Sequence, residues 1–101
     1  MLRRLLLQAT LENILGSRNV YFQPPASVSM DYPAIVYSLN GIENKHANND
    51  VYVQGISYEV IVVDEDPDNE ISKVVSKLPM CKYNRSYRSD NLNHDVYTLF
   101  Y

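Results

Sequence analysis

The feature that most constrains the fold is a long β-strand pattern that runs directly into an acidic turn. Over Val51–Asp66, VYVQGISYEVIVVDED, apolar side chains recur at alternate positions, which is the period of a strand with one buried face. Toward the end of this stretch, Ile61 and Val63 make the second face apolar as well. A strand that is apolar on both faces has to be covered on both, so we expect it to be central in a sheet.

An amphipathic helix is predicted directly after this strand, over residues 69–78. Five acidic residues lie within positions 64–70, and acidic groups favour the positive end of a helix dipole. We expect Asp66 or Asp68 to cap the helix and Pro67 to lie in its first turn, where the missing N–H is harmless. The apolar residues of the helix follow the spacing i, i+3, i+4, i+7, and they are Ile71, Val74, Val75 and Leu78.

Another helix is predicted at the start of the chain, over Leu2–Leu15, and it carries two apolar stripes. One stripe consists of Leu2, Leu5, Leu6 and Ala9, and the other of Leu7, Leu11, Ile14 and Leu15. A surface helix of a small monomer needs only one stripe. We therefore expect one stripe to face the core and the other a neighbouring subunit, unless a loop covers it. The segment is too polar for a signal peptide and too short to span a bilayer, so we expect a soluble protein.

Four further strand patterns lie at residues 19–23, 34–39, 80–88 and 94–101. We expect 34–39 and 51–63 to pair antiparallel across a long projecting loop, because residues 41–50 are polar and rich in asparagine. The last two strands are expected to form a hairpin. The resulting order, α-β-β-β-α-β-β, predicts a single α+β domain over residues 1–101, with a mostly antiparallel sheet and both helices packed on one face.

The sequence contains no arrangement of residues typical of an enzyme, a metal site or a nucleotide site. His46, His94 and Cys81 are the candidate ligands, and no two of them have the spacing of a metal-binding or catalytic motif. The alternating acids from Asp64 resemble the start of a calcium loop, but position six is not glycine and position twelve is not glutamate. We therefore expect no catalytic residues, metal or cofactor. A single cysteine excludes an internal disulfide and is typical of a reducing compartment.

Charge patterning favours contact between copies of the chain over contact with nucleic acid. The formal net charge is −3, so no overall attraction to nucleic acid or membrane is expected. Residues 82–88 interleave basic side chains with tyrosines, as in surfaces that stack on unpaired bases. Strict strand alternation, however, puts Arg85 on the tyrosine face and Lys82 and Arg88 on the other. We expect these cations to meet the acids of 64–70 on a neighbour.

Three segments together resemble the small tail-completion proteins of tailed bacteriophages, and most of all the tail terminator group. They are residues 32–39, YPAIVYSL, residues 62–68, VVDEDPD, and residues 90–101, DNLNHDVYTLFY. With the polar loop and the amphipathic helix between them, the resemblance covers nearly the whole chain. It depends on sheet and turn patterns and includes no catalytic signature.

This resemblance implies a structural role in the virion. Such proteins form a ring, usually hexameric, at the head-proximal end of the tail tube, where the ring ends tube growth and joins the tail to head-completion or stopper proteins. DNA passes through the lumen without specific binding. The implied partners are other copies of the chain, the tail tube protein and the head-completion protein. Two other functions stay open: a head-closure or connector protein of the same neck, and a small nucleic-acid-binding α+β domain.

Two groups of residues are the candidates for these contacts. We expect an intersubunit interface of apolar packing and complementary charges, formed by Leu7, Leu11, Ile14, Leu15, Asp64, Glu65, Asp66, Arg85 and Arg88. Exposed ion pairs contribute only ~0–1 kcal/mol each, so the charges would set the register of the contact. We expect the projecting loop to touch the tail tube or the head-side partner through Asn44, Lys45, His46, Asn48 and Asn49.

Overall fold

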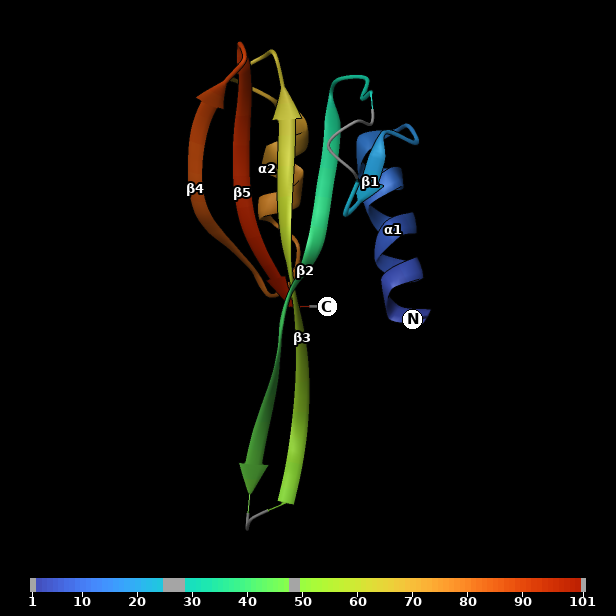
Figure 1. Cartoon of the computed structure of the whole chain (residues 1–101), viewed down its shortest axis with the longest axis vertical. Helices are drawn as coiled ribbons and strands as arrows, with labels where there is room; N and C mark the ends of the chain where they lie inside the picture. The colour runs from blue at the N-terminus through green and yellow to red at the C-terminus, as the bar shows by residue number, and fades with distance from the viewer. Residues whose placement is uncertain (1, 25–28, 48–49, 101) are drawn as a thin grey trace.

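The computed structural model describes residues 2–24, 29–47 and 50–100, and its helices and strands form an α+β fold (Figure 1). The elements are α1 (Leu2–Leu15), β1 (Val20–Phe22), β2 (Ala34–Ala47), β3 (Asp50–Asp64), α2 (Glu70–Ser76), β4 (Cys81–Ser89) and β5 (Leu92–Phe100). The predicted class and element order are confirmed. The molecule is elongated, with extents of 50 × 24 × 23 Å.

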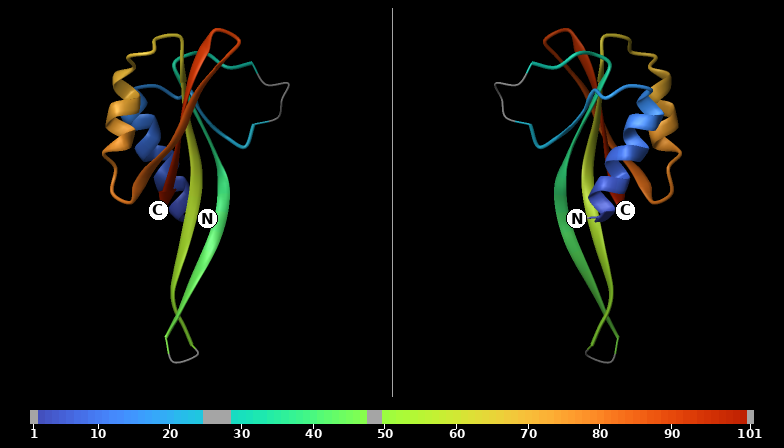
Figure 2. Two further views of the ribbon diagram at one scale, coloured as in Figure 1. Left: turned by 90° about the vertical axis from the view of Figure 1, so that its left-hand side faces the viewer. Right: turned by 90° about the vertical axis from the view of Figure 1, so that its right-hand side faces the viewer.

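The five described strands form one sheet in the order β1-β2-β3-β5-β4, with β3 in the middle as its two apolar faces predict. All neighbouring pairs in it are antiparallel except β1 with β2, which is a short parallel pair. Both helices lie on the same side of the sheet (Figure 2). We call this side the helix face and the opposite side the open face.

The core lies between the helix face and the two helices. Its strand residues alternate along β2, β3 and β5, and they are Ile35, Tyr37, Tyr58, Val60, Val62, Tyr97 and Leu99. Leu7 and Leu11 of α1 and Val75 of α2 pack against them. Because side chains alternate between the faces of a sheet, the intervening residues, such as Ile61 and Val96, belong to the open face.

A polar cluster anchors α1 to the sheet. The Tyr37 hydroxyl donates a hydrogen bond of 2.5 Å to Gln8 Oε1 and accepts one of 3.3 Å from Arg4 Nη1. Gln8 Nε2 also donates to the Val20 carbonyl at 3.1 Å, while the Arg4 guanidinium lies 4.6 Å from the centre of the Phe22 ring. Burial of the Tyr37 hydroxyl raises the pKa of this side chain above its ordinary value. These bonds join α1 to β1 and β2 at one place.

The cap of α2 differs from the prediction. Asn69, and neither Asp66 nor Asp68, is the N-cap, with its side-chain oxygen accepting from the amides of Ile71 at 2.6 Å and Ser72 at 3.2 Å. An asparagine can do this while its amide group donates to the Asp64 carboxylate, which an aspartate cannot do. Pro67 lies in the turn before the helix rather than in its first helical turn.

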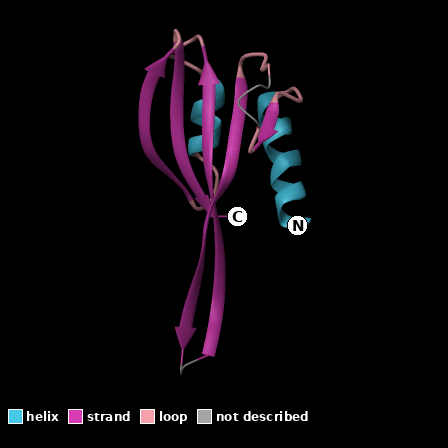
Figure 3. Cartoon of the chain, viewed as in Figure 1, coloured by secondary structure: helices cyan, strands magenta, loops and turns pink. Residues whose placement is uncertain are grey.

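The predicted projecting loop at residues 41–50 is also wrong, because β2 and β3 continue through most of it as a hairpin. Their pairing runs to Ala47 and Asp50, with register shifts after Leu39 and after Lys45. The hairpin extends well beyond the rest of the sheet, and neither helix accompanies it (Figure 3). Polar residues are disfavoured in strands, but here the pairing is supplied by the regular partner strand β3.

Candidate interaction surfaces

The two apolar stripes of α1 face in the directions opposite to those predicted. Leu7 and Leu11 are fully buried in the core of their own chain, with 0% of their surface exposed, and Ile14 and Leu15 pack against that core. Leu7 and Leu11 are therefore not free to form an intersubunit interface, whereas for the half-buried Ile14 and Leu15 such a contact stays a prediction. The stripe that faces away from the core includes Leu5 and Leu6, which are 54% and 51% exposed.

The orientation of α1 follows from its polar residues rather than from its leucines. Both stripes have helical spacing, so hydrophobic periodicity does not distinguish them. Arg4 and Gln8, however, lie on the same side of the helix as Leu7 and Leu11, and they have hydrogen-bond partners on the sheet. Turning the outer stripe inward would bury leucines at the expense of these bonds. The exposed leucines are thus the apolar surface of α1 that remains for a partner.

The edge strand β4 carries a bulge that rearranges its side chains. Its register shifts between Tyr83 and Arg85, so Asn84 is an extra residue that pairs with no residue of β5. Lys82 pairs with Thr98, Arg85 with Val96 and Tyr87 with His94. All three of these pairs belong to the open face, and β4 is exposed from Lys82 to Ser89. The bulge therefore contradicts the predicted division of faces, since Lys82 and Arg85 lie on the same side of the sheet.

The two tyrosines of β4 lie on opposite faces of the sheet. Tyr83 lies on the helix face, where its ring meets Tyr97 edge-on at 5.8 Å and its hydroxyl donates to Ser86 Oγ at 2.8 Å. Tyr87 lies on the open face and stacks on His94, with ring centres 4.5 Å apart and an angle of 7° between the planes. Arg85 lies 5.8 Å from the centre of the Tyr87 ring. One side of that ring is thus already occupied, which weakens the case for stacking on bases.

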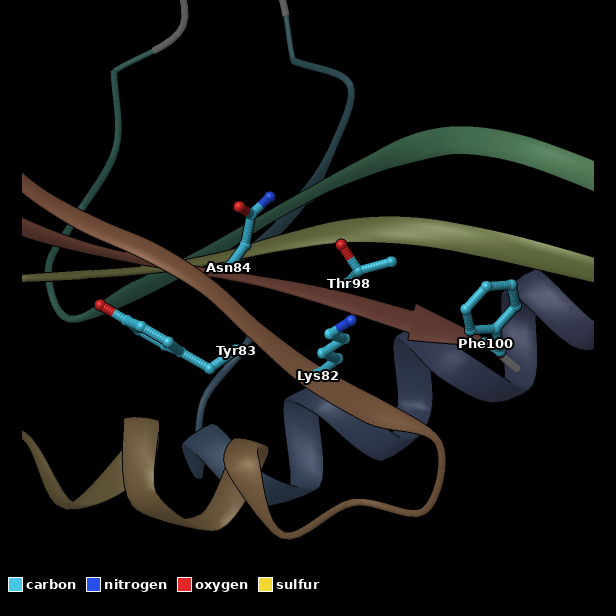
Figure 4. A pocket seen from close by; sticks show the side chains of 5 residues that line it. All are labelled: Lys82, Tyr83, Asn84, Thr98 and Phe100. Atoms are coloured by element: carbon cyan, nitrogen blue, oxygen red, sulfur yellow. The ribbon is translucent and has the colours of Figure 1, made fainter.

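A shallow hollow of about 460 Å³ lies over β4 and β5, and it is lined by Lys82, Tyr83, Asn84, Thr98 and Phe100. The Asn84 and Thr98 side chains project from neighbouring strands toward the same side (Figure 4). An ammonium, an amide and a hydroxyl supply hydrogen-bond donors to this hollow, and a phenyl ring forms its apolar wall. Periodicity alone does not predict this grouping, because Lys82 and Thr98 are brought together by strand pairing.

The predicted acidic and basic partners, the turn at residues 64–66 and the arginines of β4, lie at defined levels of the sheet. Asp64 pairs with Asn93 of β5, and Asn93 pairs with Arg88 of β4, so Arg88 lies beside the acidic turn of its own chain. Arg85 and Arg88 project to opposite faces. One acidic turn of a neighbour therefore cannot contact both arginines from one side, although contact with Asp64, Glu65 and Asp66 stays a prediction for each of them.

The predicted partner-contact residues can be placed only in part. Asn44, Lys45 and His46 belong to β2, where they pair with β3 near the tip of the hairpin. Asn48 and Asn49 lie outside the described residues. Contact between this region and another protein stays a prediction, now for the end of a strand pair rather than for a loop.

Metal-ligating and thiol side chains of the described residues are far apart or half-buried. Within residues 2–24, 29–47 and 50–100, no three His, Cys, Asp or Glu residues are close enough together to hold a metal ion. Cys81 is half-buried, and burial raises the pKa of its thiol, which disfavours the reactive thiolate. Neither described helix has the length and apolarity needed to cross a membrane.

Comparison of the chain with protein-family models, with curated proteins and with solved structures found no match. The function therefore has to be argued from the surfaces themselves. Three of them stand out: the outer leucines of α1, the projecting β2–β3 hairpin, and the basic hollow over β4 and β5.

Proposed function

We propose that this chain is a structural subunit that assembles with copies of itself into a ring at the head-proximal end of a bacteriophage tail tube. The ring ends tube growth and joins the tail to a head-completion protein, and DNA passes through it. The resemblance of the sequence to tail terminators motivates the phage role. The observation that carries the self-assembly is the projecting hairpin.

The hairpin has no support within the described part of its own chain. On one side, β1 pairs with β2 at Ile35, Val36 and Tyr37 and no further. On the other side, the pairing of β5 with β3 ends at Ser57. Residues 42–47 and 50–56 therefore pair only with each other among the described strands. An isolated two-stranded hairpin is marginally stable in water, so a hairpin of this length is best explained by a partner that it packs against.

A second surface supports the same conclusion. Leu5 and Leu6 expose about half of their area on the outside of α1, next to the part of the helix that is fixed to the sheet. A partner that covered them would remove apolar surface from water, which is the main driving force of association. The hairpin and α1 together give the subunit two separate contacts, as a ring subunit with two neighbours requires.

The experiment that tests this function is negative-stain imaging of the purified protein, alone and mixed with purified tail tubes. We expect rings in solution at high protein concentration, or a cap on one end of each tube. In a matched variant, residues 43–55 are replaced by Asn-Gly, which shortens the hairpin to the pair Ile42 and Ile56 and closes it with a favourable turn. We expect this variant to keep its far-ultraviolet circular dichroism but to lose ring and cap.

Two results would contradict the proposal. A full-length chain that neither forms rings nor caps tubes has another function. A shortened chain that assembles as well as the full-length chain removes the role of the hairpin. Binding to DNA-filled heads in preference to tubes would instead identify a head-closure protein of the same neck.

A small nucleic-acid-binding domain is the second candidate, and the bulge in β4 is the observation that favours it. By placing Lys82 and Arg85 on one face with Tyr87, the bulge creates a surface where cations and an aromatic ring are adjacent. A gel-shift with single-stranded probes at physiological salt distinguishes this function, because the ring does not require such binding.

A further inference from the structure

We propose that the basic hollow over β4 and β5 receives the acidic turn at residues 64–68 of a second copy, so that neighbouring copies meet head to tail. This inference rests on the proposed self-assembly and specifies two of the surfaces that meet. It assigns the hollow an occupant, the exposed carboxylates of another copy of the same chain.

Positive charge without an acidic partner in the described part of the chain lies in the hollow, at Lys82, and beside the hollow, at Arg85. Lys82 and Arg85 lie on the open face, both exposed, and within the described residues neither is within 4 Å of a carboxylate, since the ion pair found there joins Lys73 and Glu70. Asn84 and Thr98 add donors beside them. Such a group of donors binds anionic oxygen groups, carboxylates among them, through charge-assisted hydrogen bonds.

A partner is more readily bound by the side chains of β4 than by strand pairing with its backbone edge. Cations and a bulge on an edge strand are the features that discourage a further strand from pairing there. The strand carries Lys82, Arg85 and Arg88 together with the bulge at Asn84. A neighbour therefore meets this edge through its side chains, and acidic ones are complementary.

The acidic turn carries exposed negative charge that also lacks a cationic partner among the described side chains. Glu65, Asp66 and Asp68 are exposed, and their carboxylates have no cationic partner within the described part of the chain. The turn is nevertheless held in one shape. Asp66 Oδ1 accepts from the amide of Asp68 at 2.9 Å, and Asn93 Nδ2 donates to the Glu65 carbonyl at 3.1 Å. A turn that is already ordered loses less conformational entropy when it binds.

These two surfaces cannot meet within one chain. The turn begins at Asp64, level with Asn93 of β5, whereas Lys82 is level with Thr98. Five residues of strand separate these levels, which is about 17 Å. The two surfaces also differ from each other, so a contact between them can be heterologous and repeat from copy to copy, which forms a ring when the rotation closes. In a two-fold dimer, by contrast, this contact would occur twice, once in each direction.

The test uses two variants of the full chain with reversed charges. In one, Lys82→Glu and Arg85→Glu make the hollow acidic; in the other, Glu65→Lys and Asp66→Lys make the turn basic. Each variant alone faces like charge across the contact, so we expect its association constant at low salt, measured by sedimentation velocity, to fall at least about tenfold. Mixed in equal amounts, the acidic hollow meets the basic turn and the basic hollow meets the acidic turn. We therefore expect the mixture to associate and neither variant alone to do so.

The control is Lys77→Glu, which reverses one charge at an exposed residue on the helix side of the sheet, and we expect it to associate like the unchanged chain. Lys82→Gln with Arg85→Gln gives a neutral second variant, and circular dichroism checks the fold of each. If the unchanged chain associates and the reversed variants do so equally, or if mixing restores nothing, this inference is overturned while the ring stands. An unchanged chain that stays monomeric, alone and with tubes, overturns both.

Discussion

Replacing Leu5 and Leu6 by glutamine tests which side of α1 meets another copy. Full burial of a leucine side chain is worth about 1.5–3 kcal/mol, and these two are 54% and 51% exposed in the single chain. If a neighbour covers them, each contributes about 1 kcal/mol to association. Loss of both removes about 2 kcal/mol per contact, which is about thirtyfold in the association constant.

The same change is expected to leave the single chain almost as stable as before. Glutamine has nearly the helix propensity of leucine, and exposed substitutions away from special features usually change the free energy of unfolding by less than about 0.5 kcal/mol. The matched control is Leu11→Ala on the inner stripe, where the side chain is fully buried. Removing it should destabilise the chain by about 2–5 kcal/mol, which lowers Tm by roughly 10 °C or more for a domain of this size.

The two variants are compared by sedimentation velocity for association and by thermal melting at low concentration for stability. We expect the outer variant to lose association at an unchanged Tm and the inner variant to lose Tm. If the outer variant associates like the unchanged chain, the exposed leucines are ordinary surface residues. If Leu11→Ala weakens association at an unchanged Tm, the assignment of the two stripes is wrong.

Two further predictions concern the stability of the single chain. Asn69→Ala removes the acceptor for the amides of Ile71 and Ser72 and should lower the free energy of unfolding by about 1 kcal/mol; equal urea midpoints for the two chains would contradict this. Burial raises the pKa of Tyr97 above its ordinary value, so its contribution to stability is present below about pH 10 and is lost as the pH rises through the folded pKa. Tyr97→Phe should flatten the alkaline loss of stability, although it removes the 2.6 Å contact with Ser72 Oγ; parallel stability curves from pH 8 to 11 for the two chains would refute this.

The elements with strong local signals could be predicted from the sequence. The first helix spans Leu2–Leu15 as expected, because Gly16 follows it with a φ of 77°, a conformation that glycine adopts readily at a helix end. The central position of β3 follows from its two apolar faces, since only a middle strand has both of them covered. In each case one segment carries the whole signal.

The hairpin could not be predicted, because its signal belongs to two segments at once. Residues 41–47 are polar over 43–46 and alone resemble a loop. They become a strand through pairing with 50–57, and β propensity depends on such neighbours more than on the residue itself. The orientation of α1 has the same origin. Two equal apolar stripes are distinguished only when Arg4 and Gln8 find Tyr37 and the Val20 carbonyl across the sheet.

The bulge at Asn84 has the largest consequence for function. Regular alternation of side chains along a strand would put Arg85 on the same face as Tyr83. A bulge moves every residue after it to the other face. Tyr83 therefore keeps its contact with Tyr97 on the helix face, while Arg85 joins Lys82 on the open face. An asparagine inside a predicted strand is the one local signal, because asparagine is rare in regular strands. Through this single extra residue, the strand secures the sheet with one set of side chains and leaves its cations together for a partner.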